Sequence, residues 1–352
     1  MSQPNSDTIG KSSSRTNRAE PSRLDLKKHM EELHNDWVAF IGSLTPSVQS
    51  ASTELAHRIE IQRDVEICDW HDHFSAVTLL YANLHTECTS IGMSVRREAN
   101  LAQLCALVAA FTEDRVLDRQ IQLTSIECIF LESVRSRANA FIQELDGRSF
   151  ESRTYVERLR KRYAIAMGTD YSWRGKRGLQ YSAIRQVAPA RGYVGACVPF
   201  ALALSTGVGT GTIRRMQGAF DRLMLGLQWL DDLVDWREDL ECHDVNLMLY
   251  LMREQGLDPY SHPSNDLRDA NVGHALLERD LLELAAEQSI RWLEFASQMQ
   301  CELHCPTLGG LIKDRIRTVR AKKKAENRRV ESEVYAQLVA RGSACSALSS
   351  SA

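Results

Sequence analysis

The sequence predicts an all-α protein, and three observations support that prediction. From Leu24 onward, apolar residues recur at spacings of three and four, which is the period of a helix packed against a core. Alternating runs of β-branched residues, which would indicate strands, are few. Only eight of the 352 residues are proline, so few positions are barred from a helix interior.

Composition sets the broad class of protein. With 43% hydrophobic and 25% charged residues, a chain of this length can bury a sizeable core. The net charge of −3 gives no overall reason to expect nucleic acid or an anionic membrane as a partner. The longest apolar run, residues 194–204, is far shorter than a bilayer span, so no transmembrane helix is predicted. Nine scattered cysteines without a CxxC pair are typical of a reduced, cytoplasmic protein.

We expect one helical domain between two tails. Residues 1–22 contain serine, asparagine, proline and basic residues but almost nothing apolar, which predicts a disordered tail without a signal peptide. Residues 23–340 carry the helical pattern and would form one all-helical domain. Residues 341–352 are predicted to be a second disordered tail.

The first third of the chain predicts three helices, over Leu24–Ile41, Val48–Cys68 and Ser75–Ser90. The second is polar enough to be peripheral, whereas the third has an apolar face and is expected to be buried. His71 and His73 precede the third helix beside two aspartates. Residues two apart on a helix do not face each other, so a capping cluster is favoured there over a metal site.

A buried helix over residues 101–111 leads into the first acidic pair. Asp114 and Asp118 are four residues apart, so they lie one turn apart on the same helix face.

The second acidic stretch, residues 228–239, packs five acids into an otherwise apolar helical run. Three of them stack in one column and two flank it: Asp231, Asp235 and Asp239, with Asp232 and Glu238. Leucine and valine at spacings of three and four indicate that this helix packs against a core, which would put the acidic column at the edge of a pocket. A solvated face is the alternative for such a run, helped by Arg222 and Arg237.

Two carboxylate columns on apolar helices, more than a hundred residues apart, can face each other across a bundle and hold metal ions. Clustered oxygen ligands suit Mg²⁺, which usually also takes phosphate oxygens from a substrate. The predicted metal ligands are Asp114, Asp118, Asp231, Asp232, Asp235 and Asp239.

Basic residues that could bind a phosphate group lie between the two columns in the sequence. They form two groups: Arg153, Arg158, Arg160, Lys161 and Arg162, then Arg174, Lys176, Arg177, Arg185 and Arg191. Pro189 and Gly192 are expected to break the helix there and expose backbone groups towards a cavity. Residues 207–211 are rich in glycine but lack the Lys-Ser/Thr of a P-loop, so we expect a plain loop.

Beyond the second column, Asn246 is equally consistent with a metal ligand and a helix cap. Residues 256–274 are expected to form a loop, with helices following over residues 275–301 and 308–338. Cys301, His304 and Cys305 lack a nearby fourth zinc ligand, so a helix end is favoured. In the last helix Arg317 and Arg320 are the basic residues most suited to reach a diphosphate.

The acidic motifs together resemble those of the class I isoprenoid synthases, over about residues 70–330. The motifs are Asp114-x-x-x-Asp118, then Asp231-Asp232-x-x-Asp235-x-x-Glu238-Asp239 followed by Asp244-Val245-Asn246-Leu247. The later motif is most similar to the second aspartate-rich motif of bacterial terpene and squalene/phytoene-type synthases. The chain departs from the family in lacking the usual DDxxD first motif, the N-D-x-x-S-x-x-x-E signature and the Arg-Tyr pair near the end.

The resemblance implies a single helical bundle in which both motifs hold three Mg²⁺ ions around a prenyl diphosphate. Asp114 and Asp118 would form one wall of the site, opposite Asp231, Asp235 and Asp239. By the same resemblance, Arg185 is placed like the diphosphate-sensing arginine, and Arg317 or Arg320 like the late basic contact.

The expected activity is that of an Mg²⁺-dependent class I terpene synthase, which ionises and cyclises farnesyl or geranylgeranyl diphosphate. Aromatic faces stabilise a carbocation without attacking it, and the candidates are Trp229, Tyr81, Phe74, Trp173 and Phe200. Two alternatives stay open: a head-to-head or chain-elongating prenyltransferase, and a non-catalytic helical protein. A homodimer is also left open.

Overall fold

The computed structural model describes residues 23–60, 91–147, 149–176, 179–242, 244–259, 265–303 and 306–349. Every regular element in these ranges is a helix, which confirms the all-α prediction. The helices are α1 (Arg23–Gly42), α2 (Pro46–Glu60), α4 (Met93–Leu117), α5 (Ser125–Asp146), α6 (Phe150–Trp173), α7 (Tyr181–Arg191), α8 (Tyr193–Ser205), α9 (Thr210–Cys242), α10 (Leu247–Glu254), α11 (Asn265–Glu278), α12 (Leu281–Glu302) and α13 (Pro306–Ser349).

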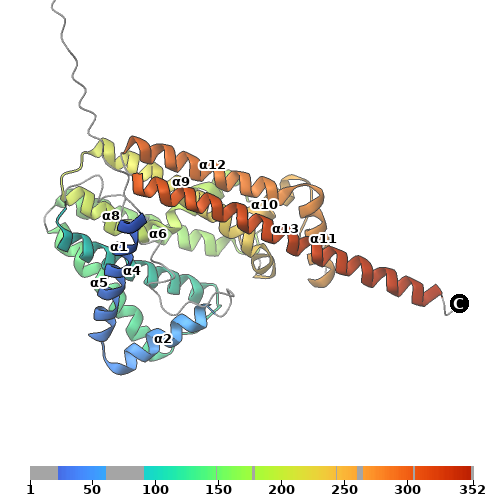
Figure 1. The fold of residues 1–352 in the computed structure, drawn as a ribbon, viewed down its shortest axis with the longest axis horizontal. Coiled ribbons are helices and arrows are strands. Elements are labelled where there is room, and N and C mark those ends of the chain that lie inside the picture. Colours follow the sequence, from blue (N-terminus) through green and yellow to red (C-terminus); the bar gives the residue numbers. More distant parts are fainter. Residues whose placement is uncertain are drawn as a thin grey trace, which may run out of the picture.

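The long helices α9, α12 and α13 lie side by side, and the C-terminal part of α13 extends beyond the rest of the bundle (Figure 1). Close contact between α9 and α12 depends on Gly226, because a Cβ there would lie 2.7 Å from the Leu293 side chain. The hydroxyl of Ser289 donates a hydrogen bond to the Gly226 carbonyl at 2.6 Å. This packing fixes the middle of α9, one turn before the acidic stretch.

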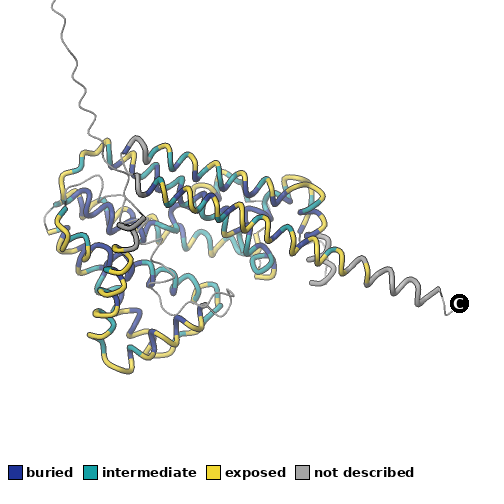
Figure 2. Tube along the Cα trace, in the orientation of Figure 1, coloured by how far each residue is buried: buried dark blue, intermediate teal, exposed yellow. Residues whose placement is uncertain are grey.

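Helix α4 joins the two hydrophobic cores of the protein. Its Ala99 and Ala102 belong to the larger core, which α6 to α13 complete, whereas its Leu104 and Val108 pack with α1, α2 and α5. Buried positions accordingly run along the inner faces of the helices in Figure 2. Packing on both sides holds the C-terminal end of α4, where the first acidic pair lies, in a fixed position.

The predicted break near Pro189 is present. Helices α7 and α8 meet at Gly192 with a bend of 58°. A Cβ at Gly192 would lie 2.5 Å from Met224 Cε on α9, so the glycine permits this close approach. About two turns later, Pro199 has no N–H to offer the Gly195 carbonyl, and the Gln103 amide of α4 donates to that carbonyl instead, at 2.5 Å.

Several predicted boundaries differ from the structure. Residues 265–274, expected in a loop, belong to α11, and a left-handed residue, Asp280 with φ 50°, separates α11 from α12 within the helix predicted from residue 275. Helix α13 continues to Ser349, so residues 341–349 are helical instead of forming the predicted tail. No proline follows Leu338 and the segment contains Ala340, Arg341 and Ala344, which are good helix formers.

Other predictions fall outside the described residues. They concern the tail over residues 1–22, the helix over Ser75–Ser90 with Phe74 and Tyr81, the His71 and His73 cluster, and the side chains of Cys301, His304 and Cys305. Within the described ranges, no helix by itself has the length and apolar character to cross a membrane, and only the bent pair of α7 and α8 meets that criterion jointly.

Candidate functional site

The first acidic pair lies where α4 ends. Asp114 is in its last turn, and Asp118 is the C-cap residue, with its N–H donating to the Asp114 carbonyl at 2.9 Å. The two carboxylates are therefore one turn apart, as the four-residue spacing predicts.

The second acidic stretch lies on α9 and lines the same pocket as the first pair. Asp231, Asp235 and Asp239 contribute from one face, and Asp232 is buried beside them. The pocket has a volume of about 540 Å³, open solvent at its mouth included. All six predicted metal ligands thus line one pocket, although the two columns are more than a hundred residues apart in the chain.

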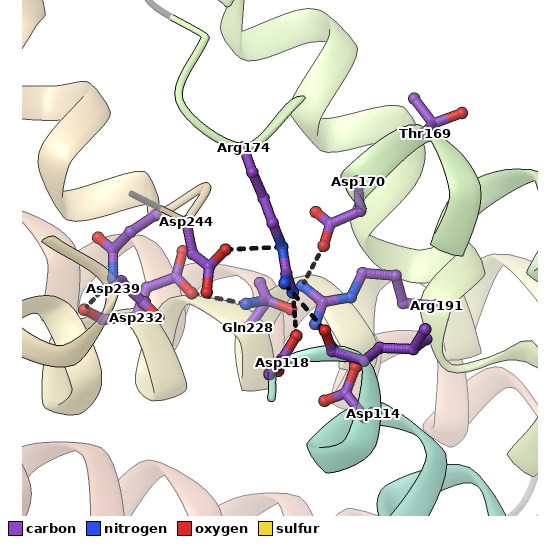
Figure 3. Close-up of polar contacts among 12 residues, drawn as sticks. Asp114, Asp118, Thr169, Asp170, Arg174, Arg191, Gln228, Asp232, Asp239 and Asp244 are labelled. Atoms are coloured by element: carbon purple, nitrogen blue, oxygen red, sulfur yellow. Dashed lines mark hydrogen bonds and ion pairs between the residues drawn. The ribbon is translucent and has the colours of Figure 1, made fainter. Parts of the chain in front are cut away.

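Two arginines lie between the carboxylates (Figure 3). Arg174, at the C-cap of α6, forms an ion pair with Asp118 and a second one with Asp244, whose Oδ1 lies 2.8 Å from Arg174 Nε. Arg191, the last residue of α7, lies 3.5 Å from Asp114 and 3.7 Å from Asp170. The guanidinium groups therefore connect the ends of α4, α6 and α7 with the loop after α9.

Asp170 lines the pocket, but the sequence analysis did not single it out. A usable signal was present, since Asp170 and Arg174 have the four-residue spacing of an ion pair on one helix face. Gln228 was also missed; its amide donates to Asp232 Oδ1 at 2.5 Å. Asp170 lies outside the acidic runs, and Gln228 opens the second run but is not itself an acid, which is why neither stood out.

The loop between α9 and α10 is organised by Asn246. Its side-chain oxygen accepts from the N–H groups of Met248 and Leu249, so it caps α10. Its amide nitrogen donates to Asp239 Oδ2 at 2.7 Å and to the Asp232 carbonyl at 2.9 Å. The structure therefore assigns Asn246 to the cap, with a second role in holding the α9 acids.

Burial and mutual repulsion raise the pKa of several acids. Burial, followed by the nearby Asp114 charge, raises the pKa of Asp118 to about 6, against the opposing effect of Arg174. Burial raises the pKa of Asp232 to about 8, although the Leu247 N–H and the Gln228 amide donate to its carboxylate. The pKa of Asp239 is also well above its usual range, first because of burial and then because of the Asp232 charge.

The donor set of this pocket suits a hard cation. Nine acidic side chains line it, against three arginines. Only oxygen ligands are offered by these acids, and such ligands favour Mg²⁺ or a similar ion. Among the described residues, however, no three acidic, histidine or cysteine groups converge closely enough to hold an ion as they stand. The guanidinium groups of Arg174 and Arg191 occupy the space between the acids instead.

Apolar space adjoins the acidic pocket. A narrow pocket lined by Trp173, Ile184, Val187 and Ala188 shares Arg191 and Asp232 with it. A further pocket, of about 440 Å³ with its mouth included, shares Trp173 and Ile184 with the narrow one. Its other linings include Leu179, Leu249 and Tyr250, with Lys176 and Arg253. The acidic pocket is therefore continuous with partly apolar linings.

Three predicted diphosphate contacts lie elsewhere. Arg185 is exposed and stacks over the Trp292 ring, 4.6 Å from its centroid. Arg185 precedes Arg191 by six residues, or about 240° around a helix, so the two point in different directions. Arg317 pairs with Asp314 and its side chain is 71% exposed. Arg320 is exposed as well, because Ile316 and Val319 take the core face of α13.

Two of the predicted aromatic residues, Phe200 and Trp229, are buried, and Trp173 is partly buried. Phe200 is a core residue that stacks on Tyr155 at 5.3 Å between ring centroids. Trp229 is also buried and packs against Tyr181, which in turn stacks on Tyr250. Trp229 precedes Asp232 by about one turn of α9, and Tyr250 lines the larger apolar pocket. Trp229 is therefore on the same helix as the α9 acids and about one turn from Asp232, whereas Phe200 is on α8.

Comparison of the sequence with family models and with curated proteins finds no match. Comparison of the structure finds geranylgeranyl pyrophosphate synthase from Lactobacillus brevis, with a TM-score of 0.64 and 11% identity over 84% of this chain and 97% of that one. Heptaprenyl diphosphate synthase from Staphylococcus aureus has a TM-score of 0.64 and 12% identity, over 87% and 99% of the two chains.

A third similar structure is polyprenyl synthase from Caulobacter crescentus, in complex with calcium and isoprenyl diphosphate. Its TM-score is 0.59 and its identity 15%, over 84% of this chain and 97% of that one. Each similarity spans nearly the whole of the other protein. The chain therefore has the all-helical fold of these prenyl diphosphate synthases.

Proposed function

We propose that this protein is an Mg²⁺-dependent prenyltransferase of the class I isoprenoid synthase type. It would ionise an allylic prenyl diphosphate and join the allylic carbon to a second prenyl substrate. The observation that supports this most is the single pocket in which two carboxylate columns and two arginines meet. The similar structures favour prenyl transfer over the cyclisation that the motifs led us to expect, because all three carry the names of prenyl chain synthases.

The carboxylates of both columns would hold the metal, with Asp114 and Asp118 on one side and Asp231, Asp232, Asp235 and Asp239 on the other. When bound, Mg²⁺ neutralises the diphosphate and so makes it a better leaving group. The calcium and isoprenyl diphosphate in the Caulobacter structure support a divalent cation with such a ligand in this fold.

Arg174 and Arg191 are the arginines that we propose as diphosphate contacts, in place of Arg185, Arg317 and Arg320. Both line the pocket, and a guanidinium can donate two parallel hydrogen bonds to phosphate oxygens. These donors stabilise the charge that grows on the diphosphate as the allylic C–O bond breaks.

The prenyl chain would enter the apolar pockets beside Trp173 and Ile184. The electron pair of the C–O bond leaves with the diphosphate, and the double bond of the second substrate attacks the allylic cation. One proton is then lost from the coupled product, and the released diphosphate is the base that we propose for it. Apolar walls keep water away from the cation until the coupling occurs.

Cyclisation is the second candidate activity, and one observation favours it. The rings of Tyr181, Trp229 and Tyr250 form a continuous aromatic group beside the larger apolar pocket. Aromatic faces stabilise carbocations that must survive several rearrangements. Here a single allylic substrate would suffice.

Incubation of the purified protein with geranyl, farnesyl and geranylgeranyl diphosphates separates the candidates. Each substrate is tested with and without isopentenyl diphosphate and with and without Mg²⁺, and the extract is analysed by mass spectrometry. A longer prenyl diphosphate formed only with isopentenyl diphosphate supports chain elongation, and a doubled skeleton supports head-to-head coupling. A hydrocarbon or alcohol from one allylic substrate alone supports cyclisation. No turnover of any substrate would favour a non-catalytic helical protein.

Two further proposals concern the protein's setting. We propose a cytoplasmic location, supported by free cysteines such as the buried Cys105 and Cys197. A homodimer stays a proposal, and light scattering of the purified protein would test it.

A further inference from the structure

Arg174 has an unusual position among the basic residues of the pocket. Its side chain leaves the end of α6, where Gly175 adopts a left-handed φ of 70°, and passes between Asp118 of α4 and Asp244 of the loop after α9 (Figure 3). It also donates to the Leu117 carbonyl at 3.1 Å. One guanidinium thus joins three segments that are distant in sequence.

The surroundings of Arg174 are those of a cation site. Two carboxylates contact the same positive group, and both are largely buried, with side-chain exposures of 19% for Asp118 and 18% for Asp244. Arg191, Asp170 and Asp114 complete the pocket around them. A single positive charge placed between two buried acids leaves net negative charge, which a divalent ion would neutralise more fully.

Of the two ion pairs that Arg174 forms, the one with Asp244 is the weaker. Arg174 Nε and Asp244 Oδ1 are 2.8 Å apart, yet both atoms are buried and neither has a hydrogen bond of acceptable geometry among the described residues. Poor alignment reduces what a close ion pair contributes. The Arg174–Asp244 ion pair can therefore be replaced by a metal–oxygen bond at Asp244 with little loss of free energy.

We propose that the Arg174 guanidinium takes the place of a divalent cation between Asp118 and Asp244 in the metal-free protein, and that metal binding requires this side chain to leave both carboxylates. The inference rests on the metal site of the proposed function. Arg174 is then a residue that sets metal affinity: it stabilises the empty pocket and competes with the ion that fills it. Two ligands that exclude each other from one site are negatively coupled, and removal of one strengthens binding of the other.

The test compares Arg174→Gln with Arg115→Gln, in the full chain and without substrate. Arg115 lines the same pocket but donates to Gln120 instead of a carboxylate, so the control removes an equal charge without breaking an acid–arginine bridge. Mg²⁺ affinity is measured by isothermal titration calorimetry, and the melting temperature is measured in EDTA. Arg174→Lys, which keeps the charge, is the second variant and should behave almost like the wild type.

We expect Arg174→Gln to bind Mg²⁺ about tenfold more tightly than the wild type, within the usual range of coupling between sites, and to melt at a lower temperature in EDTA. The control should strengthen Mg²⁺ binding much less, since it alters only the overall charge of the pocket.

Equal gains in the two glutamine variants would overturn the inference, because general electrostatics would then explain the effect. Unchanged or weaker Mg²⁺ binding by Arg174→Gln, with normal binding by the wild type, would also overturn it and leave Arg174 a structural residue. If neither the wild type nor any variant binds Mg²⁺, the metal site of the proposed function fails, and the inference fails with it.

Discussion

The two carboxylate columns have the same four-residue spacing but different partners. On α4, Asp114 and Asp118 pair with the guanidinium groups of Arg191 and Arg174. On α9, Asp232 and Asp239 accept hydrogen bonds from neutral amides instead. Asp114 and Asp118 are therefore each in contact with a positive charge, whereas Asp232 and Asp239 accept hydrogen bonds from neutral groups, and the Arg191 charge also acts on Asp232.

The pKa values of the two columns differ as well. Burial is the main cause, because Asp232 is more deeply buried than Asp118, and the neutral donors of Asp232 oppose the increase less than the Arg174 guanidinium does at Asp118. The pKa of Asp232 is raised to about 8, that of Asp118 only to about 6.

The largest expected effect is on turnover. Asp235→Asn and Asp114→Asn should each lower kcat by roughly 10²–10³-fold, because each removes a charged oxygen from the metal pocket while preserving side-chain shape. Steady-state kinetics on the substrate identified by the incubations measures this. Full activity in both variants would show that the two columns are not a metal site.

Replacing an arginine that pairs with the α4 acids should lower the free energy of unfolding more than replacing an amide that donates to the α9 acids. Arg191→Gln leaves Asp114 and Asp170 without their partner, and we expect a loss of about 1–3 kcal/mol in the free energy of unfolding. Gln228→Leu removes one donor from Asp232 but leaves the Leu247 N–H, so the loss should be near 1 kcal/mol. Urea denaturation in EDTA gives both values, and a larger loss in Gln228→Leu would reverse the comparison.

The stability of the metal-free protein should decrease as the pH rises. Acids with raised pKa values bind protons more tightly in the folded state than in the unfolded one, where they titrate near 4. Their stabilising effect is fully present below pH 4 and is lost by about pH 6 for Asp118 and about pH 8 for Asp232. Melting temperatures in EDTA between pH 5 and 9 should thus fall mainly before pH 8.

Asp232→Asn provides the control for this pH dependence. It should remove part of the decrease between about pH 6 and 8, since the pKa of Asp232 lies above that of Asp118, and Asp239, whose pKa is also raised, contributes to the remainder. A profile that is unchanged in Asp232→Asn would assign the slope to other groups.

The smallest effect is expected for the arginines of α13. Arg317→Ala and Arg320→Ala change exposed side chains, so the free energy of unfolding should shift by less than about 0.5 kcal/mol, and the KM for the prenyl diphosphate should not change. A clear rise in KM would show that α13 supplies a substrate contact after all.

Much of the fold could be predicted from the sequence because its signals are local. A period of 3.6 residues indicates helices, and Pro189 with Gly192 indicates the bend between α7 and α8. Helix ends were predicted less well. The boundary at Asp280 depends on one left-handed residue, which no apolar period reveals.

The sequence by itself determined the two carboxylate columns, since residues four apart in a helix share a face wherever that helix lies. Only the tertiary structure decided which basic residues complete the pocket. Arg174 and Arg191 reach it because α6 and α7 end beside α4, whereas Arg185 turns towards Trp292 from the same helix as Arg191. Periodicity fixes the direction of a side chain relative to its own helix, but the partner it meets depends on how separate helices pack.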